Sequence, residues 1–549
     1  MSNSYILAMY DIRGKQDYIY RSSRIKEIVG GSYIIKDCFD DFLFPAAREA
    51  SEEELGSGQG KGIFSYRRTG DTGEPAEFTP ENFADRIRRG YIGEVIYDGG
   101  GNFFVLYRDR EIYREVNRRF YHRLLDGTYS LRVLTTCIDE VHFDDYRYDQ
   151  RSLYEKHRRR EQRESMTGPV NTLPVVQTDY GTSMPLEALQ RIGERMEKVS
   201  YESKKKYEKY EKVKKDSRSY EIQIQMEGSE ILDKLITEKG EESLLAVVYI
   251  DGNSMGARVE SCLKQLRTAD GEEDRSYVSC VRALRKFSDE IQEHYIDRRI
   301  QDVDALLEQK ENGRRRFVVY AGDEVTFICN ARNAYDVAVE YLTRLAEEAP
   351  EGQPRTSCAG IAIFHSHAPF REAYRIAEEC CESGKKLMKA EGIENASLID
   401  FHYCQGAFGT SLEEIRRAED TEQSSRPWFV NCYEDGREIT DDFLVKGVCV
   451  SSRIVEMMRE MLSRAGRSNI KNLALSAKRS RAEFKSEVER IRAHQQEKQI
   501  DFTLGGRLDD EMQRKLIYDM VLVYDLWFDD TNVKESTKEG GEQDERQRV

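Results

Sequence analysis

The sequence lacks any long apolar run. Nowhere do about 18 apolar residues follow one another, which is the length that a membrane-spanning helix needs. The N-terminus also lacks a charged segment followed by an apolar one, and it leads directly into an apolar strand pattern. We therefore expect no contact with a membrane.

Paired cysteines are also lacking. The eleven cysteines are scattered without a C-x-x-C pair, and the adjacent Cys380 and Cys381 lie in a helical pattern rather than at a metal-ligand spacing. The spacing indicates neither a zinc ribbon nor a disulfide framework. The reduced cytoplasm is the expected location.

Positive charge is in short supply, because the net charge over 549 residues is -16. A protein that coats nucleic acid needs an excess of Lys and Arg, so this class is disfavoured, although local basic patches remain available for RNA or nucleotides. The length predicts several domains. The content of 34% charged and 39% hydrophobic residues favours solvated helix surface over a thick all-β core.

What the sequence does contain is a strand that delivers an acid to a loop. Residues 244–256, LLAVVYIDGNSMG, begin with an unbroken apolar run that ends on Asp251. The backbone N–H groups of the following loop are suited to holding the phosphates of a nucleotide. Alone, such a loop is also typical of an ordinary turn. The loop residues are Gly252, Asn253, Ser254, Met255 and Gly256.

A second acidic element lies at residues 317–329, FVVYAGDEVTFIC. Two short apolar runs flank a turn that holds Gly322, Asp323 and Glu324, a pattern that predicts a β-hairpin. If the two elements are neighbours in one sheet, Asp251, Asp323 and Glu324 converge at its edge. Carboxylates this close repel one another unless a cation lies between them, so we expect these three acids to bind two Mg²⁺ or Mn²⁺ ions.

Two lysines occur in a helical pattern that follows, over residues 369–389. Lys385 and Lys386 lie in its last turns, where positive charge complements the helix C-terminus. The same side chains can reach the oxygens of a triphosphate if the helix packs beside the Asp251 loop. Both interpretations stay open, and either lysine is a candidate for neutralising phosphates. Asn253 and Ser254 are the candidates for selecting the base.

The first part of the chain repeats this order. A strand ends on Asp11, a helical pattern containing Ser32 follows, and the tip of the next hairpin has glycines where the later hairpin has acids. The duplicated strand, helix, hairpin, helix and strand predict an α+β fold with two ferredoxin-like palm domains packed together, each with helices on one face of its sheet. Ser32 and the glycine tip are candidates for seating a second nucleotide, with a plain tight turn as the alternative. The tip comprises Gly99, Gly100, Gly101 and Asn102.

Composition divides the chain further. Residues 1–140 are assigned to a degenerate first palm, 141–240 to a charged helical connecting domain, and 241–405 to a catalytic second palm. Residues 406–530 have apolar positions spaced for a C-terminal helical bundle, and the polar tail 531–549 is predicted to be disordered. Basic runs in the connecting domain fit either a solvated helix face or contact with RNA.

Four segments, in this order, resemble the large polymerase-like subunit of type III CRISPR effectors. They are MYDIRGKQDYIYRSSRIKEIVGGS, the hairpin YDGGGNFFVLY, the strand and loop VVYIDGNSMG, and the hairpin YAGDEVTF. In that family the second palm carries a Gly-Gly-Asp-Asp turn and makes cyclic oligoadenylates from ATP, whereas the first palm is degenerate. Here the turn reads Ala-Gly-Asp-Glu, closer to that of diguanylate cyclases, which share the palm. Because Glu keeps an oxygen ligand, metal binding is expected to persist.

Two features of many family members are missing. One is a metal-dependent HD nuclease domain: the sequence has no His-Asp pair and no room before the first strand, so nuclease activity of that type is not expected. The other is a four-cysteine zinc element between the palms, and the corresponding TLPVVQTDYGTSMP has no cysteine. Both losses fit a stand-alone or reduced relative of the effector subunit.

The resemblance implies a metal-dependent nucleotidyltransferase that makes cyclic oligonucleotide messengers from ATP, with 3′-5′ linkage, in antiviral defence. It also implies RNA and CRISPR effector subunits as partners. A catalytically silent scaffold, in which the palm persists as an RNA-binding module, is a hypothesis of another class. A third is a synthase that makes cyclic dinucleotides from GTP.

Overall fold

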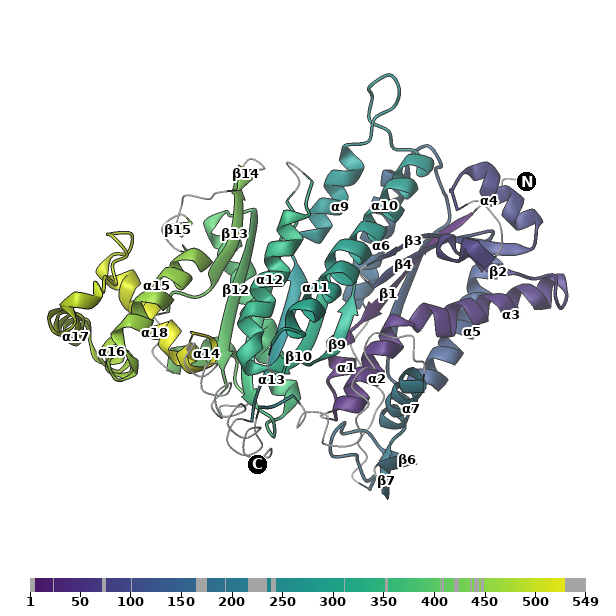
Figure 1. Ribbon diagram of the computed structural model, residues 1–549. Coiled ribbons are helices and arrows are strands. Elements are labelled where there is room, and N and C mark those ends of the chain that lie inside the picture. Colours follow the sequence, from purple (N-terminus) through teal and green to yellow (C-terminus); the bar gives the residue numbers. More distant parts are fainter. Residues whose placement is uncertain are drawn as a thin grey trace, which may run out of the picture. The chain divides into compact units, whose positions relative to one another are not determined.

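The computed structural model describes most of the chain, and this part divides into two compact units (Figure 1). The first unit contains Met1–Gly228, Ser254–Asp297 and Val318–Glu324, and the second contains Ser229–Asn253, Arg298–Phe317 and Val325–Val549. The described residues are 5–22, 24–71, 76–99, 101–163, 175–192, 194–215, 235–237, 243–310, 312–350, 354–404, 406, 409–418, 424–434, 437–438, 444–445 and 449–528.

The first unit is built on a five-stranded sheet with the order β2-β3-β4-β1-β5. Strand β1 pairs antiparallel with β4 on one side and with β5 on the other. Its residue Asp11 lies opposite Asn102, the first residue of β4. The strands span Ile6–Arg13 (β1), Gly62–Phe64 (β2), Tyr91–Gly99 (β3), Asn102–Tyr107 (β4) and Arg132–Ile138 (β5).

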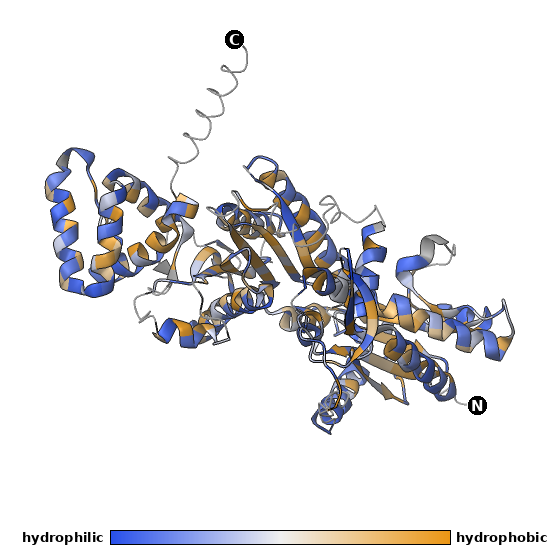
Figure 2. Cartoon of the chain, turned by 90° about the horizontal axis from the view of Figure 1, so that it is seen from below, coloured by the Kyte–Doolittle hydropathy of each residue, from blue (hydrophilic) through white to orange (hydrophobic). Residues whose placement is uncertain are grey.

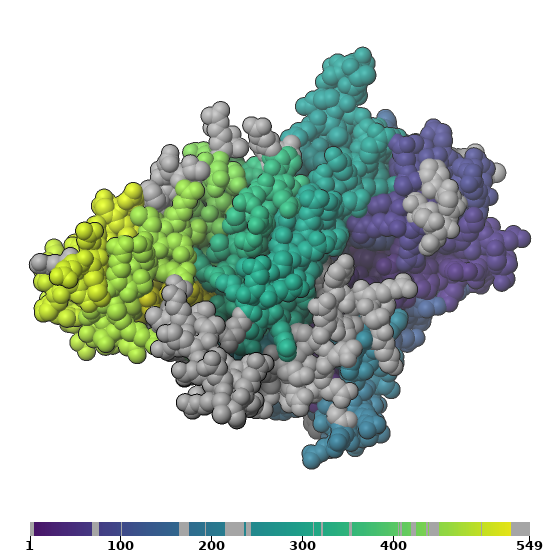
Figure 3. Space-filling model, in the orientation of Figure 1, coloured from purple at the N-terminus to yellow at the C-terminus, as the bar shows by residue number. Residues whose placement is uncertain are grey.

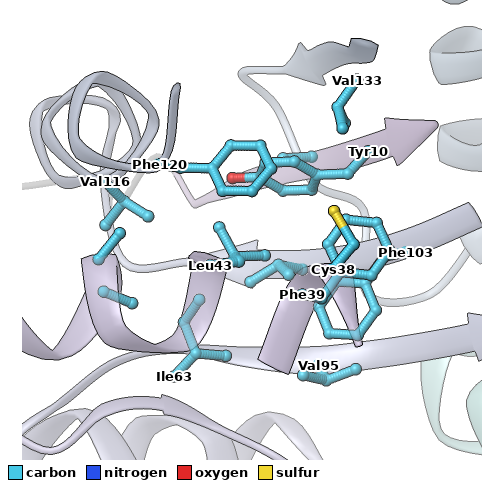
Figure 4. Close-up of a cluster of buried hydrophobic side chains, with 14 of the residues drawn as sticks. Tyr10, Cys38, Phe39, Leu43, Ile63, Val95, Phe103, Val116, Phe120 and Val133 are labelled. Carbon is cyan, nitrogen blue, oxygen red and sulfur yellow. The ribbon is translucent and has the colours of Figure 1, made fainter. Parts of the chain in front are cut away.

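Both faces of this sheet are buried, because β1 is apolar at odd and at even positions. Tyr10 points into one core, where its ring lies edge-on to Phe120 of α5 with 5.6 Å between centroids (Figure 4). Met9 points into the other core, which includes Tyr277 of α10. The expectation of helices on one face is therefore wrong for this sheet. The helices of this unit are α1 (Lys15–Ile19), α2 (Ile25–Lys36), α3 (Phe44–Leu55), α4 (Pro80–Arg88), α5 (Arg110–Thr128), α6 (Tyr146–Arg163), α7 (Tyr201–Lys215), α9 (Met255–Lys264) and α10 (Tyr277–Ile291).

The charged connecting region, residues 141–240, contains strands as well as helices. Besides α6 and α7 it contains a two-stranded antiparallel sheet of β6 (Leu186–Ile192) and β7 (Arg195–Ser200). Later in the same unit, the loop between α9 and α10 is closed by a bridge between Arg267 and Glu273, and it projects from the surface (Figures 1 and 3).

The second sheet has seven strands in the order β14-β13-β12-β11-β8-β10-β9. Its part β9-β10-β8-β11 repeats the order β3-β4-β1-β5 of the first sheet, so the predicted duplication and the tandem palm fold are confirmed. The strands span Leu244–Gly252 (β8), Arg315–Ala321 (β9), Glu324–Asn330 (β10), Ser357–His365 (β11), Asn395–Tyr403 (β12), Trp428–Glu434 (β13) and Arg437–Glu438 (β14). In Figure 2 the strands are mostly hydrophobic, whereas the outward faces of the helices are hydrophilic.

Helix α13 (Phe370–Glu391) approaches this sheet unusually closely. Gly360 of β11 faces the backbone of α13, and a side chain at this position would meet the carbonyl oxygen of Ala377 and the amide of Cys381. The helix accordingly presents small residues to the sheet, at Ala377, Cys381 and Gly384. Helix α12 (Ala334–Glu347) also packs on strands of this sheet, whereas α11 (Arg298–Leu307) packs on α12 and α14 (Leu412–Ala418) contacts α13.

The C-terminal part is mainly helical, as the pattern predicts. Helix α16 packs against α17 and α18. The expected helical domain of residues 406–530 is not purely helical, because two short strands, β15 (Leu444–Val445) and β16 (Cys449–Val450), precede its last helices. The predicted disordered tail, 531–549, lies outside the described residues. The helices are α15 (Ser452–Ala465), α16 (Arg467–Arg479), α17 (Arg481–His494) and α18 (Asp510–Val523).

Two expectations from composition can be compared with the described residues. Every helix among them is too short or too polar to cross a bilayer. The ten cysteines whose side chains are described are all free thiols. Within that part of the chain, no disulfide framework supports the fold.

Replacing Gly360 by Ala should destabilise the second unit by about 2–3 kcal/mol, because the added methyl group forces β11 and α13 apart. Gly256→Ala is the matched control, since a side chain there enters open space. Urea denaturation of both variants checks this, and equal stabilities would contradict the close approach.

Candidate active site

Asp251 lies at the end of β8, where the strand leaves the core and its carboxylate becomes half-buried. The ammonium of Lys385, on α13, forms an ion pair with Asp251 Oδ2 and lies 3.2 Å from the carbonyl oxygen of Gly252. Burial opposes the charge of this lysine, but the adjacent carboxylate outweighs it, so the pKa of Lys385 is raised. The ammonium of Lys385 is therefore paired with the acid at the end of the strand.

The structure distinguishes the two candidate lysines. Lys385 follows Cys381 by one helical turn and thus shares the face of α13 that packs on the sheet. Lys386 is exposed to solvent. Of the pair, only Lys385 contacts the Asp251 loop in the described structure.

Asn253 is buried rather than open to a ligand. Its amide nitrogen donates to the Ala396 carbonyl at 2.8 Å and to Thr356 Oγ1 at 3.3 Å, and its backbone N–H donates to the Thr356 carbonyl. These bonds tie the end of β8 to β12 and to Thr356, the residue that precedes β11. The prediction that this side chain selects a base does not fit its position, because the amide group serves the fold.

Ser254 begins helix α9 in a left-handed conformation, with φ 55° and ψ 34°. Its hydroxyl is exposed and does not cap the helix, which leaves the first-turn amides of Met255 and Gly256 uncapped by this residue. In the first repeat, Gly14 has the same conformation and also lies three residues after a strand-end aspartate, Asp11. The shared geometry indicates that the two strand-to-helix turns are equivalent.

The predicted acidic hairpin is present as β9 and β10. Gly322 has φ 66°, which a two-residue turn of this kind requires at its first position. Asp323 completes the turn and Glu324 opens β10, the neighbour of β8, and both acids are half-buried. Among the described residues no three His, Cys, Asp or Glu side chains gather as a metal site. The convergence of Asp251, Asp323 and Glu324 therefore stays a prediction.

The first repeat neutralises its aspartate with several protein groups. Asp11 Oδ2 lies 2.9 Å from Arg13 Nη1 and 3.2 Å from His157 Nε2. Burial raises the pKa of Asp11, and the hydrogen bonds and charges of these two residues outweigh burial, so the pKa is lowered. His157 is buried between Asp11 and Thr136. Nothing in the basic sequence around His157 distinguishes it from a solvated helix face.

The glycine tip of the first hairpin is packed by the protein itself. A side chain at Gly99 would meet the Tyr97 hydroxyl, and one at Gly101 would meet the ammonium of Lys15. Burial lowers the pKa of Lys15, and the charges of Asp11, Glu324 and Asp323 partly offset this effect. The glycines thus make room for protein side chains, and Gly100 lies outside the described residues.

Ser32 lies half-buried in the middle of α2. The preceding Gly30 faces the backbone of Lys206 on α7, and a side chain there would collide with that carbonyl oxygen. Lys206 in turn forms a fully buried ion pair with Glu202. The Gly-Gly-Ser run therefore serves the packing of α2 on α7, while Ser32 stays a predicted nucleotide contact.

Residues 244–393 match the family model of Cas10/Cmr2, second palm domain. This segment of the chain is Cas10-like. The resemblance to the large subunit of type III CRISPR effectors is thereby confirmed, and Asp251, Asp323, Glu324 and Lys385 all fall within the matched Cas10-type palm. No curated protein matches the chain.

Solved Csm1 structures are similar at low identity. The apo Csm1-Csm4 cassette shares 13% identity at a TM-score of 0.47, over 95% of this chain and 70% of that chain. Csm1 from T. onnurineus shares 13% identity at a TM-score of 0.47, over 95% of this chain and 69% of that chain. The Csm1-Csm4 cassette in complex with cA4 shares 13% identity at a TM-score of 0.42, over 95% of this chain and 70% of that chain.

A buried ionic network holds α13 of the Cas10-type palm in place. Asp400 of β12 accepts a hydrogen bond from Ser383 and two from Arg416, at 2.7 and 2.9 Å. Burial raises the pKa of Asp400, but Arg416 and the other donors outweigh it, so its pKa is lowered. A second buried pair joins Arg426 to Asp519 of α18 at 2.9 Å. Because Ser383 is two residues from Lys385, this network also fixes the site lysine.

Asn253→Ala should lower the stability of the palm by about 2 kcal/mol, because two buried acceptors lose their donor. Ser254→Ala is the control, since that hydroxyl is exposed. Chemical denaturation measures both, and a loss of nucleotide selectivity in Asn253→Ala without loss of stability would contradict the structural role.

His402 should make stability depend on pH. Burial and the charges of Arg426 and Arg416 lower its pKa from 6.5 to about 4. The unfolded chain therefore takes up a proton at higher pH than the folded protein does. The stabilisation is present above about pH 6.5 and is lost as the pH falls toward 4, by about 3 kcal/mol in all.

Denaturation curves between pH 7 and 4.5 test this, with His402→Gln as the comparison. The variant should lose less stability than the wild type over this interval. Parallel pH profiles of the two proteins would contradict the assignment.

Proposed function

We propose that the second palm is a metal-dependent nucleotidyltransferase that makes cyclic oligonucleotides from ATP, with 3′-5′ linkage, in antiviral defence. The observation that carries this proposal is the half-buried pair of Asp251 and Lys385. It combines a carboxylate for a metal with a cation for phosphates, and Asp251 lies three residues before Ser254, the N-cap of α9. The match to a Cas10/Cmr2 palm supports the same assignment.

The oxygen donors at the end of β8 fit a hard divalent cation. The Asp251 carboxylate and the Gly252 carbonyl already converge on one positive charge, the Lys385 ammonium. Oxygen ligands of this kind are those that Mg²⁺ and Mn²⁺ prefer. In the proposal, Asp323 and Glu324, from the turn that leads into the neighbouring strand β10, supply the remaining carboxylates.

The reaction joins the 3′-oxygen of one nucleotide to the α-phosphorus of another and breaks the bond to pyrophosphate. Asp251, Asp323 and Glu324 would hold two Mg²⁺ or Mn²⁺ ions, which would supply Lewis acidity for the 3′-hydroxyl and for the leaving pyrophosphate. Lys385 offsets the negative charge of the triphosphate. The first-turn amides of Met255 and Gly256 donate to its oxygens.

An activating RNA and other CRISPR effector subunits are the proposed partners, and the cytoplasm is the proposed location. The scaffold hypothesis differs in one respect, because a silent palm has no use for divalent cations. A GTP-using synthase differs in the nucleotide consumed. Both alternatives are outcomes of one experiment.

The full chain, incubated with labelled ATP or GTP and Mn²⁺, with and without RNA, should release pyrophosphate and form a cyclic product from ATP. Asp323→Ala and Asp251→Asn should each lower the rate at least about 100-fold, because metal ligands act on the transition state. Asp270→Asn, an exposed acid in the α9–α10 loop, should have the wild-type rate.

Mass analysis of the products decides between the hypotheses. If products form from GTP and none form from ATP, the substrate of the proposed reaction is GTP instead of ATP. If no mixture releases pyrophosphate and Mn²⁺ does not raise the melting temperature, the proposed enzyme is contradicted and the scaffold hypothesis remains.

A further inference from the structure

The contact between Lys385 and Asp251 occupies the same oxygens that the proposed function gives to a divalent cation. The ammonium is bound by the Asp251 carboxylate and lies 3.2 Å from the Gly252 carbonyl. Both side chains of the pair are 24% exposed, so solvent and ligands reach them. A cation entering at Asp251 meets a positive charge already in place.

The surrounding fold holds the lysine backbone firmly but leaves its tip movable. Helix α13 is anchored by its small residues against Gly360 and by the bond from Ser383 to Asp400. The lysine itself has a long flexible stem and a compact ammonium with three donors. Its end can therefore change partners while the helix stays in position.

We propose that Lys385 is an exchangeable counter-ion: it holds Asp251 in the absence of metal and turns to the nucleotide phosphates when a divalent cation binds the carboxylate. This inference rests on the proposed function of the palm. In this exchange the ammonium changes its anionic partner, and no proton transfer is part of the step. The site then favours metal together with nucleotide over metal alone.

The physical reason is a balance of like and opposite charges. An ammonium and a divalent cation on the same carboxylate repel each other, so free metal must displace the lysine at a cost. A triphosphate offers the displaced ammonium new oxygen partners and thereby removes that cost. Lys385 thus weakens binding of metal alone and strengthens binding of nucleotide.

Lys385→Met in the full chain tests this exchange. Titration with Mn²⁺ alone, followed by electron paramagnetic resonance of the free ion, should show about fivefold tighter binding in the variant than in the wild type. Binding of a non-hydrolysable ATP analogue with Mn²⁺ should weaken about tenfold or more. Asp251→Asn identifies the part of the Mn²⁺ signal that belongs to this site.

Lys386→Met is the matched control, because it removes the same charge from the adjacent, exposed residue. It should change neither affinity. Lys385→Arg keeps the charge and should bind Mn²⁺ as the wild type does. Lys385→Gln is a second neutral variant, and melting temperatures establish that each protein is folded.

The outcomes separate the inference from the function on which it rests. Unchanged or weaker Mn²⁺ binding in Lys385→Met and Lys385→Gln, with an Asp251-dependent signal in the wild type, overturns the exchange and leaves the proposed function standing. Absence of an Asp251-dependent signal in the wild type and in every Lys385 variant overturns both. Opposite changes in metal and nucleotide affinity support the exchange.

Discussion

The close approach of helix α13 to strand β11 is the constraint on which the candidate site depends. Gly360 has no side chain, so the backbone of α13 lies directly on the sheet. One turn after Cys381, which faces Gly360, the helix places Lys385 at the end of β8. The charge at Asp251 is therefore positioned by core packing, which is more rigid than a loop.

The ionic network under α13 extends this constraint toward the C-terminus. Asp400 joins Ser383 of α13 to Arg416 of α14, and the neighbouring Arg426 binds Asp519 of α18. Buried charges of this kind are costly unless each has its partner. Their presence indicates that the last helices of the chain help to hold the helix that carries the site lysine.

The two repeats treat the same strand-end aspartate differently. Asp11 receives hydrogen bonds from Arg13 and from the buried His157, two directed groups from separate elements. Asp251 has one flexible cation, Lys385, with a backbone carbonyl beside it. Asp11 is less exposed than Asp251, at 15% against 24%, and the described residues give Asp11 two side-chain partners where Asp251 has Lys385. The asymmetry agrees with a degenerate first palm and a second palm that retains its acids.

Much of the fold could be predicted from the sequence because local pattern and global topology agree. The apolar run that ends on Asp251 forms β8, and the segment after the Gly-Asp turn forms its neighbour β10. The sequence repeat predicts that both sheets share a strand order. The second buried face of the first sheet could not be predicted in this way. It is covered by α10, which lies far away in the sequence and brings Tyr277 into that core.

Less of the candidate site could be predicted from the sequence, because several of its contacts come from residues far away in the chain. Asn253 follows a strand and looks like a loop residue, yet its amide is buried and donates to Thr356, which precedes β11, and to Ala396 of β12. The choice between Lys385 and Lys386 had a usable signal, since the spacing of Ala377, Cys381 and Gly384 marks the buried face of the helix. The contact of His157 with Asp11 had no usable signal in the sequence, because a single histidine in a basic helix forms no periodic pattern.

The overall charge of the chain explains why these few local cations matter. A net charge of -16 disfavours a polyphosphate at long range. At physiological salt such repulsion is screened beyond about 8 Å, whereas partly buried charges inside a site are screened much less. In the proposed function, binding of a triphosphate beside Asp251 is therefore decided within the site, where α13 places the ammonium of Lys385. In the proposed function, the lysine that α13 brings to Asp251 supplies positive charge for an anionic substrate at the acid that would hold the metal.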